Sequence, residues 1–178
     1  MMKLLQALCP LVFLLACSTS KTSVLQDTCK SFAAKHTDIG YDYCIKFFQA
    51  DKGSAAAADK RGLAAIAVKI VGAVSKSTTK RIAALRASEK DKRRLECLSS
   101  CAEVYSDAVA EIAVAAQGIA SGTASGLGEA VTALSAVLDA PSTCEQGFVE
   151  LNVPSPLAAE DAEFGKEASV ALSVTAAL

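Results

Sequence analysis

The chain has 178 residues, the length of one ordinary domain, and 52% of them are hydrophobic. Much of that fraction is alanine, aromatic residues make up only 5%, and tryptophan is absent, which favours close-packed helices over a bulky aromatic core. With 18 Lys and Arg against 19 Asp and Glu, the net charge gives no indication of a nucleic acid or an acidic membrane surface as partner.

Residues 1–20 have the pattern of a secretory signal peptide. Lys3 supplies the positive charge before an apolar run at residues 4–16, which is too short to cross a bilayer. Small residues follow, so cleavage is expected at about residues 18–23. We therefore expect a secreted, extracellular protein that has no membrane association once this segment is removed.

The same segment has a second interpretation as the leader of a bacterial lipoprotein. Leu14, Leu15, Ala16 and Cys17 resemble a lipobox, in which the cysteine is acylated and kept. If the leader is removed instead, five cysteines remain in an oxidising compartment where disulfides persist. Because five is an odd number, one thiol is left over. The five are Cys29, Cys44, Cys97, Cys101 and Cys144.

A helical hairpin is expected at residues 24–50. Residues 24–36 and 41–49 can each form a short helix, and residues 37–40 form the turn between them. Two helices this short are marginal on their own in water. Cys29 and Cys44 flank the turn, where a cross-link would stabilise the pair.

Residues 55–178 carry the apolar periodicity of four longer helices. The clearest stripe alternates spacings of three and four residues, as in helices that pack on near-parallel neighbours. It comprises Leu95, Leu98, Ala102, Tyr105, Val109, Ile112 and Ala116. Similar stripes run from Leu63 to Val74, from Leu127 to Leu138 and from Leu157 to Leu178, and no segment alternates with period two. The pattern predicts an all-α, up-and-down four-helix bundle.

Polar and glycine-rich segments separate the stripes. Residues 76–79 are expected to precede a short helix at 81–87, and residues 88–91 to cap the next long helix. Residues 118–128 are rich in Gly and Ser and predict a flexible loop. At 152–156 the chain is expected to stop sharply, with Ser155 capping the last helix.

Catalysis is poorly supported by the sequence. His36 is the single histidine, and a hydrolytic triad would have to be built around it without any nucleophile-elbow motif. We expect instead a surface histidine at a helix end. A zinc site from Cys97, Cys101, Cys144 and His36 lacks the second close ligand pair that such sites use. No catalytic, cofactor-binding or metal-binding residue is therefore predicted.

The acidic residues near the start of the last helix form no acid–base pair that the sequence reveals. Glu160, Asp161 and Glu163 are expected to lie on its solvated face, where negative charge complements the helix dipole.

The cysteine contexts resemble those of the plant invertase and pectin methylesterase inhibitor family. Thr28-Cys29-Lys30 and Tyr41-Asp42-Tyr43-Cys44 are similar to its entry hairpin, and Cys101 to Ala108 to its Cys-x3-Tyr segment. Leu134 to Asp139, followed by Thr143-Cys144-Glu145-Gln146-Gly147-Phe148, is similar to its Ala/Leu-rich helix and its Thr-Cys-Glu-x-Gly-Phe end. Ser155-Pro156-Leu157 fits the opening of its last helix.

The resemblance implies a four-helix bundle with a projecting N-terminal hairpin. It implies disulfides Cys29–Cys44 and Cys101–Cys144, which leave Cys97 as a free thiol. It further implies a secreted, non-catalytic inhibitor of a plant cell-wall carbohydrate enzyme, located in the apoplast, which disfavours the lipoprotein. The remaining alternative is a secreted helical binding protein or pollen allergen of this fold without an enzyme target.

Three features depart from the family pattern. Cys97 is additional and lies where it can compete for Cys144, and Pro141 predicts a kink before that residue. Some invertase inhibitors carry Pro-Lys-Phe in the loop that joins two bundle helices and enters the invertase active site. The matching residues here are Gly122, Thr123, Ala124, Ser125 and Gly126, without a basic or aromatic group. This candidate target-contact loop favours pectin methylesterase slightly over invertase as the target.

Overall fold

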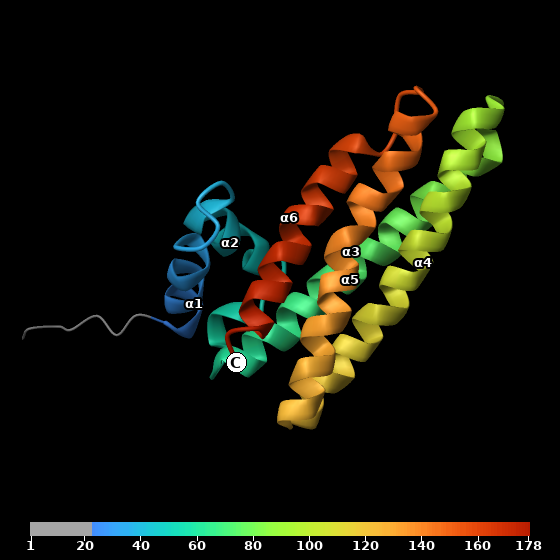
Figure 1. The fold of residues 1–178 in the computed structure, drawn as a ribbon. Helices are drawn as coiled ribbons and strands as arrows, with labels where there is room; N and C mark the ends of the chain where they lie inside the picture. Colours follow the sequence, from blue (N-terminus) through green and yellow to red (C-terminus); the bar gives the residue numbers. More distant parts are fainter. Residues whose placement is uncertain (1–22) are drawn as a thin grey trace, which may run out of the picture.

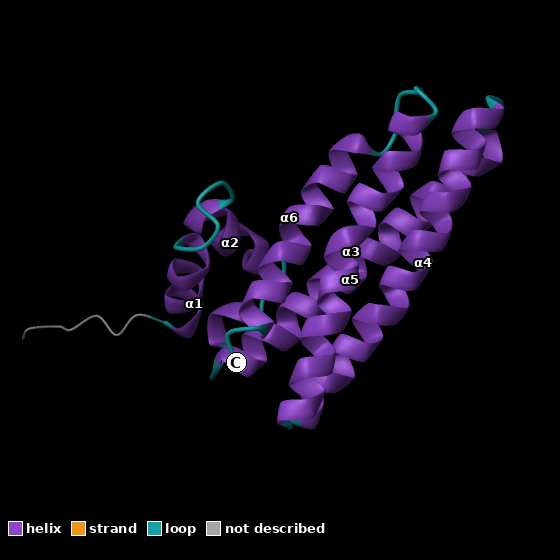
Figure 2. Ribbon diagram, in the orientation of Figure 1, coloured by secondary structure: helices purple, strands orange, loops and turns teal. Residues whose placement is uncertain are grey.

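A computed structural model of the protein describes residues 23–178, so the signal-peptide and lipobox interpretations concern residues outside the described part. Within it, every regular element is a helix, and the all-α prediction is confirmed (Figure 2). The helices are α1 (Val24–Ala33), α2 (Gly40–Gln49), the short 3-10 helix η1 (Ser54–Ala56), α3 (Lys60–Ser88), α4 (Lys92–Ser121), α5 (Ala124–Glu150) and α6 (Ala158–Thr175).

Helices α3 to α6 form an up-and-down bundle, with α1 and α2 as a hairpin to one side (Figure 1). Each bundle helix packs on its chain neighbours, and α6 closes the arrangement against α3. The hairpin contacts the bundle mainly through α1, which packs on α3 and α6, and α2 adds a hydrogen bond from Tyr43 to Glu163 of α6. One end of the bundle therefore carries the α3–α4 and α5–α6 connections, and the other carries the α4–α5 turn (Figure 1).

Small side chains at the helix contacts form the core together with a few large ones. Tyr105, Phe148 and Phe164 are among the largest fully buried side chains of the bundle. Alanines fill the positions between them, and Ala64, Ala67, Ala115, Ala130, Ala168 and Ala171 have no exposed surface. Because the alanine side chain is short, the helices approach closely, and many van der Waals contacts between them stabilise the core without large side chains.

The break expected at residues 76–79 is absent. Helix α3 continues through this polar stretch for 29 residues. The hydroxyl of Thr78 donates to the carbonyl of Val74 at 3.2 Å, and that of Thr79 to Ser75 at 2.9 Å. Hydroxyls that bond back to the preceding turn are satisfied within the helix, so these residues need not end it.

The flexible loop expected at residues 118–128 is a two-residue turn. Helix α4 ends at Ser121, and Gly122 follows it with a φ of 70°, in the left-handed region that suits glycine. Thr123 then caps α5 by accepting a hydrogen bond from the Gly126 amide at 3.1 Å. A Cβ atom on Gly118 would overlap the carbonyl oxygen of Gly126. These glycines allow two helix backbones to touch, which the composition of the segment alone does not show.

Pro141 lies inside α5 without ending it. The proline is buried, and Gly165 of α6 lies opposite its ring, with 3.9 Å between the ring Cγ and the place of a Cβ. Further along, the Ser155 hydroxyl accepts from the Leu157 amide at 3.0 Å, but Ser155 does not cap the last helix as the sequence predicted, because the N-cap residue is Leu157 and it makes no side-chain cap hydrogen bond. Helix α6 begins only at Ala158.

His36 links the hairpin to the bundle and is not the surface histidine that the sequence predicted. It is half-buried, stacks on Phe32 with 4.5 Å between ring centres, and its Nε2 lies 2.6 Å from the Ser173 hydroxyl of α6. The Tyr43 hydroxyl adds a second link by donating to Glu163 at 2.9 Å. Both contacts join residues more than a hundred positions apart, beyond the reach of local patterns.

Replacing Gly118 or Gly126 by Ala should lower the free energy of unfolding by about 1–3 kcal/mol, because the added methyl group forces α4 and α5 apart. The measurement is chemical denaturation of each variant beside the unaltered protein.

Gly128→Ala is the matched control, because Gly128 lies in α5 together with Gly126. No atom lies within 4 Å of the place of its Cβ, so it should be neutral or stabilise the protein by up to about 1 kcal/mol. Equal losses at all three glycines would contradict the close approach.

Candidate functional site

The structure brings four of the five described cysteines together in two pairs. Cys29 of α1 is bonded to Cys44 of α2, with 5.5 Å between their Cα atoms, and the bond joins the two hairpin helices. Cys101 of α4 is bonded to Cys144 of α5, with Cα atoms 4.6 Å apart. Closing loops of 15 and 43 residues contributes about 3 and about 4 kcal/mol on the chain-entropy model.

Cys97 is the free cysteine of the described chain, and it is buried. It lies one helical turn before Cys101, and its sulfur is 3.8 Å from the place that a Cβ on Gly147 would take. Burial raises the pKa of the thiol, so little of the reactive thiolate forms. Cys97 packs as a small apolar group and is poorly suited to compete for Cys144.

Peptide mapping without reduction should recover the Cys29–Cys44 and Cys101–Cys144 links, and a thiol reagent should label Cys97 only after unfolding, because the folded chain shields it. Cys97→Ala should keep both links. If Cys144 is recovered bound to Cys97, or if native Cys97 reacts at the rate of a free thiol, this assignment of the thiol is wrong.

The acids at the start of α6 do not all face solvent, contrary to the sequence prediction. Asp161 is 2% exposed and accepts a hydrogen bond from the hydroxyl of Tyr105, itself fully buried in α4. Its second oxygen has no hydrogen-bond partner among the described residues. Burial raises the pKa of Asp161 to about 7; the Tyr105 hydrogen bond opposes this rise, whereas Glu145 and Glu160 add to it.

Asp161 also belongs to a cluster with Cys144 and Glu145. Among the described residues, this is the one group whose possible metal-ligand atoms lie close together, within 4.8 Å of one another. The Cys144 sulfur is committed to its disulfide, and Glu145 accepts a hydrogen bond from Ser155 at 2.5 Å. The cluster is thus a polar contact that joins α4, α5 and α6 inside the bundle.

Stability should fall as pH rises from about 4 to about 7. In that range the folded chain holds a proton on Asp161 that the unfolded chain has lost, so unfolding releases it and becomes easier at higher pH. The slope reaches about 1.4 kcal/mol per pH unit for one such group. Denaturant titrations at pH 5 and pH 7.5 measure it.

Asp161→Asn should flatten this dependence, because the amide is neutral at both pH values and still accepts from Tyr105. Burial also raises the pKa of Glu167 to about 7, so Glu167→Gln should remove a further part of the fall in stability between pH 5 and pH 7.5. Asp51 acts in the opposite sense: its hydrogen bond to Lys69 lowers its pKa, and that stabilisation is lost only at lower pH. A wild-type protein equally stable at pH 5 and pH 7.5 would contradict the assignment.

The residues of the candidate target-contact loop lie at the α4–α5 end of the bundle. Gly122 and Thr123 form the turn itself, whereas Ala124, Ser125 and Gly126 are the first turn of α5. All except Gly126 are exposed. The segment is blunt and presents backbone and small side chains rather than a projecting loop.

Arg61 lies beside this turn, and the sequence did not reveal its proximity. Its guanidinium donates to the Ile119 carbonyl at 2.9 Å, and it lies 3.5 Å from the place of a Cβ on Gly122. Arg61 belongs to α3, whose first turn lies at the same end of the bundle as the end of α4. The turn therefore gains a basic group from a helix that is distant in sequence.

A shallow groove of about 510 Å³ runs between α3 and α4. Its lining is mostly apolar, with Val68, Gly72 and Ile112 buried, and it includes the exposed residues Lys69 and Lys76. The lining also includes Ala73, Val109, Ala113 and Ala116.

The sequence matches the family model described as plant invertase/pectin methylesterase inhibitor over residues 23–174. The chain belongs to this family. A relative from Platanus acerifolia, named "Putative invertase inhibitor", is 29% identical across 98% of this chain and 97% of its own length. The pectinesterase inhibitor of Actinidia deliciosa is 31% identical across 64% of this chain and 60% of its own length.

Solved structures of the family share the fold. A mutant form of a pectin methylesterase inhibitor from Arabidopsis matches with a TM-score of 0.71 at 20% identity, covering 88% of this chain and 98% of that one. A second, from Arabidopsis thaliana, matches with a TM-score of 0.61 at 19% identity, covering 88% and 96%. The resemblance noted in the sequence is confirmed, and neither the lipoprotein nor the binding protein without a target gains support.

As a member of the inhibitor family, the chain is an enzyme inhibitor and not an enzyme. The described helices include none that is long and apolar enough to span a membrane.

Proposed function

We propose that the mature chain is a secreted inhibitor that binds pectin methylesterase in preference to invertase. The blunt α4–α5 turn carries this proposal. An inhibitor that plugs a narrow active-site pocket needs a projecting anchor, usually an aromatic or basic side chain. Here the turn has only Gly122 and Thr123 outside the helices, and Arg61 beside it is tied to a backbone carbonyl.

The rest of the described surface also lacks an aromatic anchor. Its exposed large hydrophobic residues are Leu95, Val114, Val149 and Leu178, all of them aliphatic. The aromatic rings of the bundle are buried, and those of the hairpin are buried or half-buried. An interface of about 1,600 Å² must then form through helix faces, which suits a long, open polysaccharide groove better than a pocket for a disaccharide.

The groove between α3 and α4 is the helix face best shaped for such a contact. Its apolar lining provides area to bury, and Lys69 and Lys76 can pair with acidic groups of a partner. Lys69 also pairs with Asp51 at 2.7 Å. We therefore place the main contact with pectin methylesterase at this groove.

Several observations support secretion. The leader-like first 20 residues and the paired cysteines suit an exported chain. Membership of a plant inhibitor family that includes a named pectinesterase inhibitor agrees with an apoplastic location, because pectin is a cell-wall polymer.

The purified mature chain should inhibit plant pectin methylesterases and leave invertases active in parallel assays. Ala73→Arg and Ala113→Arg place a bulky charge at exposed positions of the groove and should weaken inhibition about tenfold or more, because the partner can no longer pack there.

Ser135→Arg, on an exposed part of α5 outside the groove, is the control and should inhibit normally. Inhibition of invertase alone would contradict the argument from the turn. Full inhibition by both groove variants would move the contact elsewhere on the bundle. Placing Pro-Lys-Phe at residues 123–125 tests whether the turn is what prevents invertase binding. The variant should bind invertase only if the unaltered chain fails to do so because its turn lacks these side chains.

A further inference from the structure

The balanced net charge conceals a strong separation of charge along the chain. Residues 80–94 contain seven Lys and Arg and two acids, whereas residues 95–178 contain one Lys and 12 acids. The basic residues lie on the last turns of α3, on the α3–α4 connection and on the first turn of α4. We name this surface the basic turn; its members are Lys80, Arg81, Arg86, Lys90, Lys92, Arg93 and Arg94.

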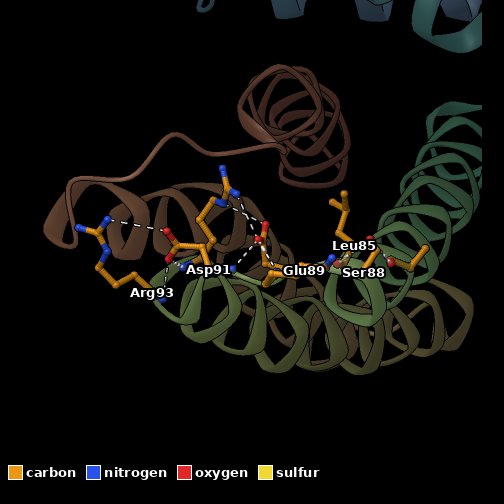
Figure 3. Close-up of polar contacts among 8 residues, drawn as sticks. Leu85, Ser88, Glu89, Asp91 and Arg93 are labelled. Atoms are coloured by element: carbon orange, nitrogen blue, oxygen red, sulfur yellow. Dashed lines mark hydrogen bonds and ion pairs between the residues drawn. The ribbon is translucent and has the colours of Figure 1, made fainter.

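The two acidic residues within the basic turn, Glu89 and Asp91, accept hydrogen bonds from backbone amides. Glu89 accepts hydrogen bonds from the amides of Lys90 and Asp91 at 2.7 and 2.8 Å and pairs with Arg94 (Figure 3). Asp91 caps α4 by accepting from the amides of Arg93 and Arg94. Backbone hydrogen bonds also lower the pKa of both carboxyls. These hydrogen bonds hold both carboxylates at the turn, and their ion pairs are with Arg93 and Arg94.

Four of the seven basic side chains extend into solvent without an ion-pair partner among the described residues. They are Lys80, Arg86, Lys90 and Lys92, and all are exposed. Of the others, Arg81 pairs with Glu160, Arg93 with Asp91 and Arg94 with Glu89. The neighbouring end of α5 carries Glu150, which accepts from Gln146.

The position of these charges is unfavourable for the isolated fold. Lys92, Arg93 and Arg94 occupy the first turn of α4, which contains no acidic residue. Arg93 and Arg94 pair with Asp91 and Glu89 before the helix, and Lys92 has no ion-pair partner among the described residues. A helix N-terminus is already positive, so cations there repel the dipole and one another. A bound polyanion would relieve that repulsion, and its charge would match the exposed ammonium and guanidinium groups.

We propose that the basic turn binds an acidic polysaccharide, a polymer with repeating carboxylates such as de-esterified pectin. The choice of ligand rests on the proposed function, because a pectin methylesterase removes methyl esters and leaves carboxylates on its substrate. The basic turn and the α4–α5 turn lie at opposite ends of α4, about 45 Å apart for 30 residues (Figure 1). The inhibitor can thus be held on the polymer by one end of the bundle.

The test is retention of the purified mature chain on immobilised polygalacturonate and on highly methyl-esterified pectin, without any enzyme. Retention should occur on polygalacturonate at low salt and disappear by about 0.3 M salt, where charges are screened beyond several ångströms. The esterified polymer should bind at least about tenfold more weakly, because it lacks the carboxylates.

A variant with Lys80→Gln, Arg86→Gln, Lys90→Gln and Lys92→Gln should lose about tenfold or more in affinity and melt no lower than the unaltered protein. The matched control carries Lys30→Gln, Lys35→Gln, Lys46→Gln and Lys52→Gln in and beside the hairpin. It has the same net charge and should bind polygalacturonate normally. Equal loss in both variants, or none in the first, would overturn the proposal.

Three further outcomes separate the hypotheses. Tighter binding to anionic phospholipid vesicles or to RNA than to polygalacturonate would overturn the ligand class. A chain that inhibits pectin methylesterase but is not retained on polygalacturonate would overturn this inference alone. A chain that is retained but inhibits neither enzyme would contradict the proposed function and leave the basic turn as a polysaccharide site.

Discussion

The close approach of α4 and α5 is the constraint on which the rest of the bundle depends. At one end Gly118 and Gly126 bring the two backbones into contact, and at the other Cys101 and Cys144 join them covalently. Cys97 fits against Gly147 one turn further along. With this pair fixed, α3 and α6 pack on its two sides and meet each other. The thin, alanine-rich core is sufficient because no contact between neighbouring helices has to span a wide gap.

The helices and the bundle followed from periodicity, because each stripe of apolar residues repeats over several turns and local sequence carries that signal. Leu63, Leu98, Leu134 and Phe164 were all on predicted stripes and are fully buried. Predictions failed where one residue type has two uses. The glycines at 118 and 126 suit a loop as well as a close helix contact, and the threonines at 78 and 79 suit a cap as well as a helix interior.

Contacts between distant residues were beyond the sequence reasoning. Asp161 looked like a solvated acid because its partner Tyr105 lies on another helix, and Arg61 is far along the chain from the turn it approaches. The cysteine contexts were the exception, since several short motifs identified the family together. That resemblance implied the fold and the inhibitor role, but the surface that selects a target depends on spatial arrangement and required the structure.

The two disulfides each lie within one part of the molecule, the first inside the hairpin and the second between α4 and α5. No covalent link other than the chain itself joins the hairpin to the bundle in the described residues, and the contacts between them include two side-chain hydrogen bonds, from His36 and Tyr43. In amide hydrogen exchange, the hairpin and the bundle would then open as two separate cooperative units. Evolution can alter the hairpin's docking angle while both cross-links, and the bundle core, remain intact.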